Sequence, residues 1–168
     1  MACTNKKGLR VVYGDYTLGV HGDGFDYIFS YAQGGLESIV KNGYEWLYRC
    51  PKPTFWRALT DNDRGSKFHI KSGSWLAADM FINCTDVEVI MDGVSQGKPV
   101  APGNNKYGAD VYAESMIVKY VYETVTTPAT TVEVTYSIAE DGKITVNVLY
   151  KGVQGLPQLP VFGLRFIM

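Results

Sequence analysis

Short runs of β-branched and aromatic residues alternate with tight-turn dipeptides along this chain, and no other feature restricts the fold as much. Thr130 to Ile138 alternates apolar and polar residues, as a strand with one buried face does. Asn42-Gly43 and Asp141-Gly142 each lie between two such runs, and residues of these types tolerate the positive φ angles of tight hairpins. Similar runs cover residues 9–13, 17–21, 25–31, 36–40, 81–91, 109–124, 143–150 and 161–168.

This succession predicts an all-β fold, an antiparallel β-sandwich with one short helix. In the run over residues 109–124, one face carries a set of apolar side chains that we expect in the core, namely Met116, Val118, Tyr120 and Tyr122. The helix is expected over Ile70 to Asp79, where Ser74 offers a cap and Trp75 and Ala78 follow at helical spacing.

The composition narrows the class of protein. A chain of 168 residues is long enough for one core, so residues 1–168 are expected to form one domain. The net charge of −1 argues against a nucleic-acid-binding protein, and no apolar stretch approaches a membrane span. Cys3, Cys50 and Cys84 are an odd, widely spaced set, which is typical of reduced thiols in a cytoplasmic protein.

The final run, Val161 to Met168, is apolar to its last residue. A hydrophobic strand with an unpaired edge favours aggregation. We therefore expect that the natural polypeptide continues past Met168, or that another chain covers this strand.

The segment Phe55 to Gly65 (FWRALTDNDRG) holds two aromatic residues, two arginines, two aspartates and an asparagine. Such a segment is expected to form a polar network against an apolar surface, at a site or an interface. If it were a strand, Asp61 and Asp63 would share one face, and their carboxyls could reach the spacing of about 5–5.5 Å that retaining glycosidases use. However, Arg57 and Arg64 would hold both acids ionised, which favours a structural network over a general acid.

Other kinds of site find little support. Counted from Asp61, the fifth, sixth and twelfth positions do not fit a calcium loop, and His21 and His69 are too few for a zinc site. No G-x-S-x-G or P-loop motif occurs. The tryptophans could stack on sugar rings or pack in the core; Trp56 is the best candidate for a sugar contact, while Trp46 and Trp75 are more typical of core positions.

FWRALTDNDRG closely resembles the signature, approximately W-R-A-x-x-D-N-D-x-G, that opens the small-chain domain of family 2 β-galactosidases. The upstream stretch from Tyr13 to Arg49 and the downstream KSGSWLAAD, NNKYG and GLPQLPVFGLRFIM resemble the same domain. The likeness is greatest to the separate small subunit of heterodimeric enzymes. It implies a sandwich that is part of a galactose-mutarotase-like supersandwich, and hydrolysis of terminal β-galactosides such as lactose with retention of configuration.

The chain departs from the family in one large respect. The family's two catalytic glutamates lie in a TIM barrel that is absent here, as is the C-terminal part that lends an aromatic residue to the galactose site. Residues 1–168 therefore resemble the N-terminal part of the small subunit, which we expect to be inactive alone.

The resemblance also implies roles for individual residues, none of them catalytic. Residues that match the signature and would shape the active site or an interface are Trp56, Arg57, Asp61, Asn62 and Asp63. Gly65 and Ser66 match the start of a loop at the mouth of the active site that can move over it; from composition alone, a loop here could equally be a plain connection. Magnesium and sodium belong to the whole enzyme, so no metal or cofactor is assigned to this chain.

Three functions remain open from the sequence. The first is a non-catalytic subunit or domain of a β-galactosidase that docks on the catalytic large subunit and helps to gate the galactoside site. The second is a free-standing carbohydrate-binding module that uses Trp56 and tyrosine-rich faces. The third is an aldose epimerase, which needs a placed acid and base that two scattered histidines do not supply.

Overall fold

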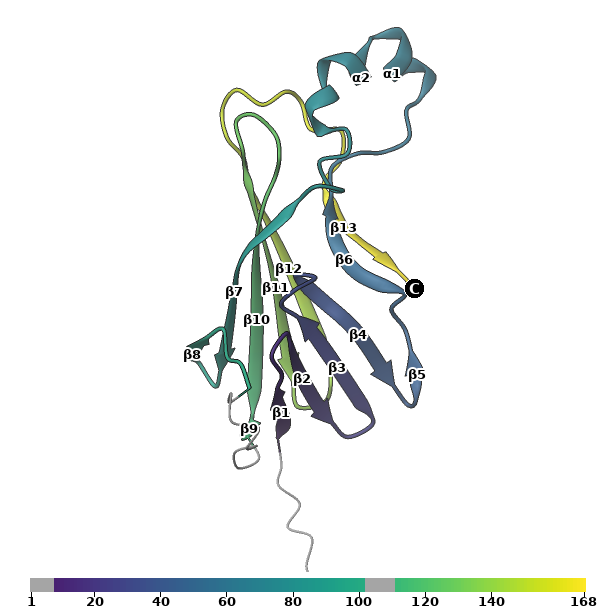
Figure 1. Cartoon of the computed structure of the whole chain (residues 1–168). Helices are drawn as coiled ribbons and strands as arrows, with labels where there is room; N and C mark the ends of the chain where they lie inside the picture. The colour runs from purple at the N-terminus through teal and green to yellow at the C-terminus, as the bar shows by residue number, and fades with distance from the viewer. Residues whose placement is uncertain (1–7, 102–110) are drawn as a thin grey trace, which may run out of the picture.

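The computed structural model describes residues 8–101 and 111–168 and shows antiparallel sheets stacked face to face, with a helical segment at one end (Figure 1). The N-terminal sheet has six strands in the order β5-β4-β3-β2-β1-β9. Their bounds are β1 (Leu9–Tyr13), β2 (Thr17–Gly22), β3 (Phe25–Ser30), β4 (Gly35–Lys41), β5 (Tyr44–Glu45) and β9 (Val111–Ala113).

The second sheet has five strands in the order β12-β11-β10-β7-β8, and every neighbouring pair is antiparallel. Their bounds are β7 (Asn83–Met91), β8 (Val94–Gly97), β10 (Ser115–Glu123), β11 (Thr131–Ala139) and β12 (Ile144–Lys151). The predicted all-β sandwich is confirmed. The predicted NNKYG match and Cys3 lie outside the described residues.

The core lies between the two sheets, where alternate residues of β10 and β11 face β1 to β4. Met116, Val118, Tyr120 and Tyr122 are all buried, as their alternation predicts. The Tyr120 hydroxyl donates to the carbonyl of Gly35 at 3.2 Å, which ties the two sheets together. Burial raises the pKa of the phenols of Tyr120 and Tyr122 far above the ordinary value, so both stay neutral donors.

The two predicted hairpin turns are present but differ in length. Asn42 and Gly43 have φ angles of 52° and 78° and join Lys41 directly to its partner Tyr44, as in a two-residue turn. The turn at Asp141-Gly142 is longer, because the last pair of β11 and β12 is Ile138 with Ile144.

Besides β8, a second strand was not predicted. β6 (Arg49–Thr54) pairs with β13 (Gly163–Ile167) in a separate two-stranded sheet, which joins the C-terminal run to the middle of the chain. The β6 sequence contains Pro51 and Pro53, which lack the N–H that a central strand needs. A strand with one paired edge accommodates them. Among the described residues, β6 is the only strand that pairs with β13.

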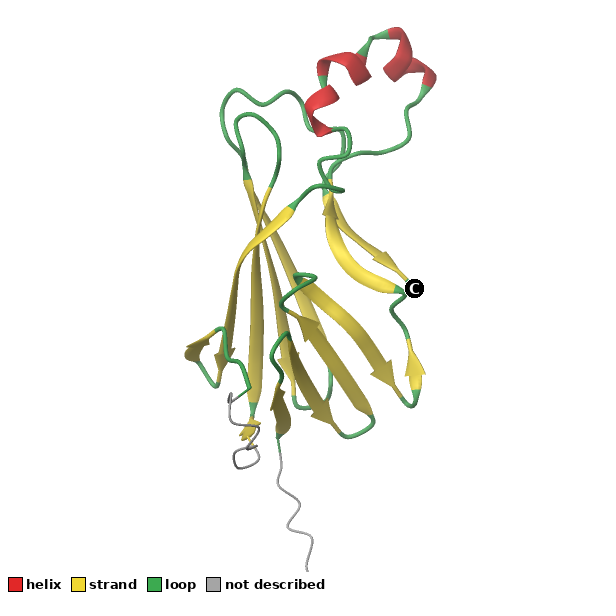
Figure 2. Cartoon of the chain, in the orientation of Figure 1, coloured by secondary structure: helices red, strands yellow, loops and turns green. Residues whose placement is uncertain are grey.

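The predicted helix over Ile70 to Asp79 was wrong in its bounds. The structure has two short helices, α1 (Asp61–Gly65) and α2 (Phe68–Lys71), followed by the 3₁₀ turn η1 (Gly73–Trp75) (Figure 2). Ala77 has a φ of 62°, which a right-handed helix does not allow, so no helix continues to Asp79. In the described part of the chain, none of these helices has the length and apolar character to cross a lipid bilayer.

Candidate functional site

The signature segment leaves the sandwich between β6 and β7 and forms the helical segment, defined here as residues 55–82 (Figure 1). Phe55 and Trp75 anchor its two halves: both are fully buried, and their rings stack at 5.4 Å between centroids. The Trp75 indole donates to the carbonyl of Pro157 at 3.1 Å. Tyr150 of β12 and Phe162, just before β13, complete this aromatic cluster, so the helical segment is held on the sandwich by rings from one strand and one loop.

Asp63 is the centre of the polar network in this segment. Its carboxylate accepts two hydrogen bonds from the Arg57 guanidinium, at 2.7 and 3.0 Å, in the bidentate geometry that favours a strong pair. The Asp63 side chain is 14% exposed and that of Arg57 is 39% exposed. The expected network of charged side chains is therefore present.

Asp63 also caps the start of α1. The Thr60 hydroxyl accepts from the Asp63 backbone N–H at 3.2 Å, while the Asp63 carboxylate accepts from the Thr60 backbone N–H at 2.8 Å. This reciprocal pair is a capping box with aspartate in place of glutamate. It explains why TDNDRG begins a helix, which was not predicted here.

The hydrogen bonds from the Arg57 side chain, and then those from Thr60, hold the pKa of Asp63 well below its usual range. The same contact raises the pKa of Arg57. Asp63 is therefore a permanent anion with its oxygens already occupied, which is unsuited to a general acid.

Asp61 has a different environment. Its side chain is 97% exposed and pairs with the Arg64 guanidinium at 3.0 Å. The idea that Asp61 and Asp63 share one face of a strand was wrong, because residues two apart in a helix point in different directions. A pair of cooperating carboxylates does not form here.

The remaining predicted residues surround α1. Trp56 is half-buried and packs against the core. Asn62 is exposed, and its backbone carbonyl accepts from the Ser66 backbone N–H at 2.9 Å. Gly65 is the last residue of α1, and a Cβ added there would meet no atom within 4 Å. Ser66 caps the end of the helix, and Lys67, with a φ of 56°, separates it from α2.

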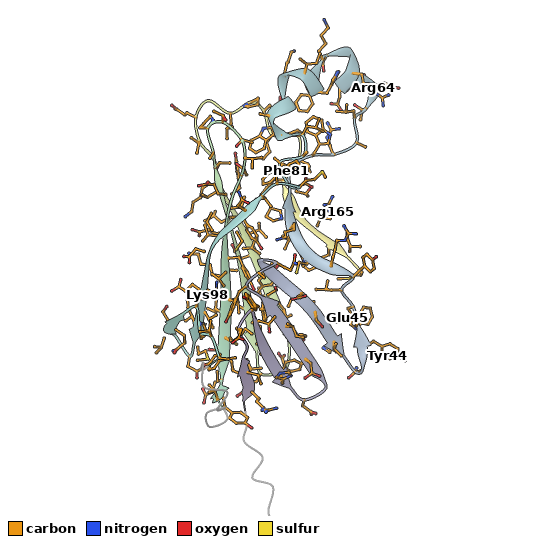
Figure 3. The ribbon with its side chains drawn as sticks, in the orientation of Figure 1. Tyr44, Glu45, Arg64, Phe81, Lys98 and Arg165 are labelled. Carbon is orange, nitrogen blue, oxygen red and sulfur yellow. The ribbon has the colours of Figure 1, made fainter. Side chains whose placement is uncertain are left out.

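Sequence reasoning missed an apolar rim on the same segment. Four large side chains here are more than 60% exposed, and we call them the apolar rim: Ile70, Leu76, Met80 and Phe81. Figure 3 shows Phe81 where the helical segment meets β7 and Arg64 farther out on α1. Leu76 lies directly before the break at Ala77, and Met80 and Phe81 follow it, whereas Ile70 lies on α2.

The described residues contain no group of three or more His, Cys, Asp and Glu side chains placed to hold a metal ion. His21 lies on β2 with its Nδ1 atom 2.5 Å from Asp26, and His69 lies on α2. The histidines therefore do not converge on one site. Cys50 and Cys84 are free and half-buried, and burial raises the pKa of both thiols.

The family model and the relatives that match this chain agree on one family. A family model described as "Beta galactosidase small chain" matches residues 21–168. The β-galactosidase small subunit of Latilactobacillus sakei is 58% identical over 168 residues, which is 100% of this chain and 52% of the relative.

Two longer relatives align over nearly the same region. The β-galactosidase of Clostridium acetobutylicum is 38% identical over 94% of this chain and 15% of its own length. That of Streptococcus thermophilus is 34% identical over 96% of this chain and 14% of its own. The chain thus spans about half the length of the small-subunit relative, and a much smaller share of the longer ones.

Proposed function

This chain belongs to the β-galactosidase small-chain family, and we propose that it is a non-catalytic small subunit or domain of a family 2 β-galactosidase. In this proposal it docks on the catalytic barrel of a large subunit and helps to shape and gate the galactoside site. The complete enzyme hydrolyses terminal β-galactosides such as lactose in the cytoplasm, and this sandwich is part of a larger supersandwich. Magnesium and sodium, where the enzyme uses them, are held mainly outside this chain.

The observation that carries the docking proposal is the apolar rim beside the signature segment. Large apolar side chains that are exposed together on a folded segment are typical of protein interfaces. The aromatic cluster around Trp75 fixes the segment that carries the rim, so little conformational freedom would be lost on binding. The longer relatives support the partner, since in them the matched region is 14–15% of one polypeptide.

The polar network supports a shaping role. The Arg57 guanidinium and the Asp63 carboxylate bind each other, so neither is free for acid–base chemistry. Such a pair makes a fixed polar surface on the helical segment, suited to positioning a neighbouring loop or substrate. The chemistry then depends on carboxylates of the partner.

The other two candidate functions have less support. Trp56 packs against the core, which leaves only part of its ring for a sugar. For an epimerase, the two histidines lie on different elements: His21 is on β2 beside Asp26, and His69 is on α2.

Docking through the rim can be tested with Leu76→Asp and Phe81→Asp. A charge at an interface centre is costly to desolvate, so each variant should bind the large subunit about tenfold or more weakly. Binding would be measured by sedimentation of the mixed subunits. Tyr16→Asp is the matched control, since Tyr16 is 71% exposed on the turn between β1 and β2, away from the rim.

Thermal unfolding should show that the rim variants fold as the parent does, because these side chains are exposed. If both rim variants bound the large subunit as tightly as the parent and the control, docking through this surface would be refuted.

A further inference from the structure

A second group of aromatic residues is exposed at the opposite end of the β6–β13 sheet from the helical segment (Figure 1). Tyr44, Trp46 and Tyr48 occur at every second position and are 73%, 54% and 76% exposed. We call these three residues the aromatic strip. Tyr44 and Trp46 are two apart in an extended stretch and therefore lie on one side, at a spacing of about 6.5–7 Å, whereas Tyr48 lies at the bend that leads into β6.

The backbone beneath the aromatic strip is held firmly. The Glu45 carboxylate accepts from the backbone N–H groups of Ile39 and Leu47, both at 2.9 Å. Trp46 donates its backbone N–H to the Ile39 carbonyl at 2.9 Å, and Leu47 is buried. Because Glu45 and Leu47 fix the segment, the exposed rings are not needed to hold it.

A polar pocket of about 470 Å³ adjoins the strip at Tyr48. This volume is within the range of small-molecule sites, about 300–1,000 Å³. Figure 3 shows Tyr44, Glu45 and Arg165 on the same side of the molecule. The polar side chains that line the pocket are Gln33, Glu37, Arg49, Lys52 and Arg165.

Contacts within the protein position parts of this lining. The Arg165 guanidinium lies 3.4 Å from the carboxylate of Asp79, whose side chain is only 10% exposed. The Arg49 guanidinium lies 5.4 Å from the centre of the Tyr48 ring, which links the pocket to the strip. The half-buried Lys52 ammonium donates to the Gly34 carbonyl at 3.2 Å.

The chemistry of the surface selects one class of ligand. Aromatic rings offer flat apolar faces, while the pocket offers guanidinium and amide donors together with carboxylate and amide acceptors. A pyranose ring has apolar C–H faces and hydroxyls that both donate and accept hydrogen bonds. The lining carries three cationic side chains beside the Glu37 carboxylate, and one of the three, Arg165, is paired with Asp79.

We propose that the aromatic strip and the adjoining pocket form a saccharide-binding site for a neutral oligosaccharide. Successive hexose rings stack on Tyr44, Trp46 and Tyr48, and the ring at one end enters the pocket beside Arg49 and Glu37. The site is separate from the signature segment. It would hold a saccharide chain on the small subunit without taking part in its hydrolysis, so the proposal does not depend on docking or gating.

The test is a titration of the complete polypeptide that carries this domain, without a catalytic partner, followed by Trp fluorescence and calorimetry. The probes are a β-1,4-linked galactotetraose and lactose. The tetrasaccharide should bind saturably and more tightly than lactose, since it can cover more of the strip. Trp46→Ala and Tyr44→Ala should each weaken tetrasaccharide binding about tenfold, the effect of losing one stacking contact.

Tyr16→Ala is the matched control, because Tyr16 is as exposed as Tyr44 but lies outside the strip and the pocket. It should bind the tetrasaccharide as the parent does. The proposal is overturned if neither probe binds saturably, or if Trp46→Ala and Tyr44→Ala bind as the parent does. It is also overturned if these two variants lose only association with the large subunit, which would make the strip a protein interface.

Discussion

At the scale of single residues, Asp63 explains why the signature segment folds as it does. One carboxylate caps α1, binds Arg57 through both oxygens and accepts from Thr60. The pairing of these acids with arginines was predicted from the sequence. The helical geometry was not, because a threonine followed three residues later by an aspartate is a weaker capping signal than one followed by glutamate.

Replacing Asp63 should therefore affect stability in a pH-dependent way. The pKa of Asp63 in the folded protein lies below its value in the unfolded chain, which is about 3.9. The carboxylate therefore contributes its full stabilisation at pH values above about 3.9. Asp63→Asn should be less stable than the parent at pH 7, and the difference should shrink as the pH falls below about 4. Urea unfolding at several pH values measures this.

Asp61→Asn is the matched control in the same helix, since the Asp61 side chain is 97% exposed and its ion pair is screened by solvent. The free energy of unfolding of Asp61→Asn should match that of the parent at pH 7 and below pH 4. An equal loss for both variants, or a loss for Asp63→Asn that does not change with pH, would contradict this account of the network.

Gly65 allows a separate test of gating. A Cβ there meets nothing within 4 Å, and alanine favours a helix over glycine by about 1 kcal/mol, so Gly65→Ala should leave stability unchanged or raise it. If the end of α1 is a hinge in the assembled enzyme, the same variant should lower kcat. Gly73→Ala, also in open space, is the control and should leave kcat unchanged. Parental kcat for Gly65→Ala would argue against a hinge at this position.

At the scale of elements, the aromatic cluster connects the helical segment to the sandwich. Trp75 is fully buried, stacks on Phe55 and contacts Tyr150 edge-on at 6.2 Å between ring centres. Removing so large a buried ring leaves a cavity beneath the helices. The position of the signature segment therefore depends on a residue outside the signature.

Trp75→Ala should lower the free energy of unfolding by about 3–5 kcal/mol, the usual cost of truncating a buried large aromatic residue. Chemical denaturation measures it. Trp46→Ala removes the same side chain from an exposed position and should change stability by no more than about 0.5 kcal/mol. Similar losses for the two variants would show that the cluster does not hold the segment.

The elements also show where sequence patterns stop being informative. Strands with a clean period of two, such as Thr131–Ala139, were predicted to within a residue. β6 was not predicted, because its prolines indicate a loop and only pairing with β13, over 100 residues later, makes it a strand. The prediction of a helix over 70–79 was wrong because Ala77 takes a left-handed conformation. The sequence does not indicate this, since alanine is not a residue typical of turns.

At the scale of the whole molecule, we propose that the candidate site is a surface completed by a partner. The sequence identified the signature residues, but not the apolar rim or the polar pocket, because both combine segments whose meeting depends on tertiary structure. The pocket joins residues of β6 and β13 to Gln33 and Glu37. Neither the apolar rim nor the pocket corresponds to a periodic pattern in the sequence.

The central claim is that this domain completes a β-galactosidase without doing chemistry itself. The most direct measurement mixes the complete small subunit with the catalytic large subunit and follows hydrolysis of a β-galactoside. We predict that activity appears in the mixture and is absent from the small subunit alone. Activity of the large subunit that is the same with and without this partner would contradict the claim.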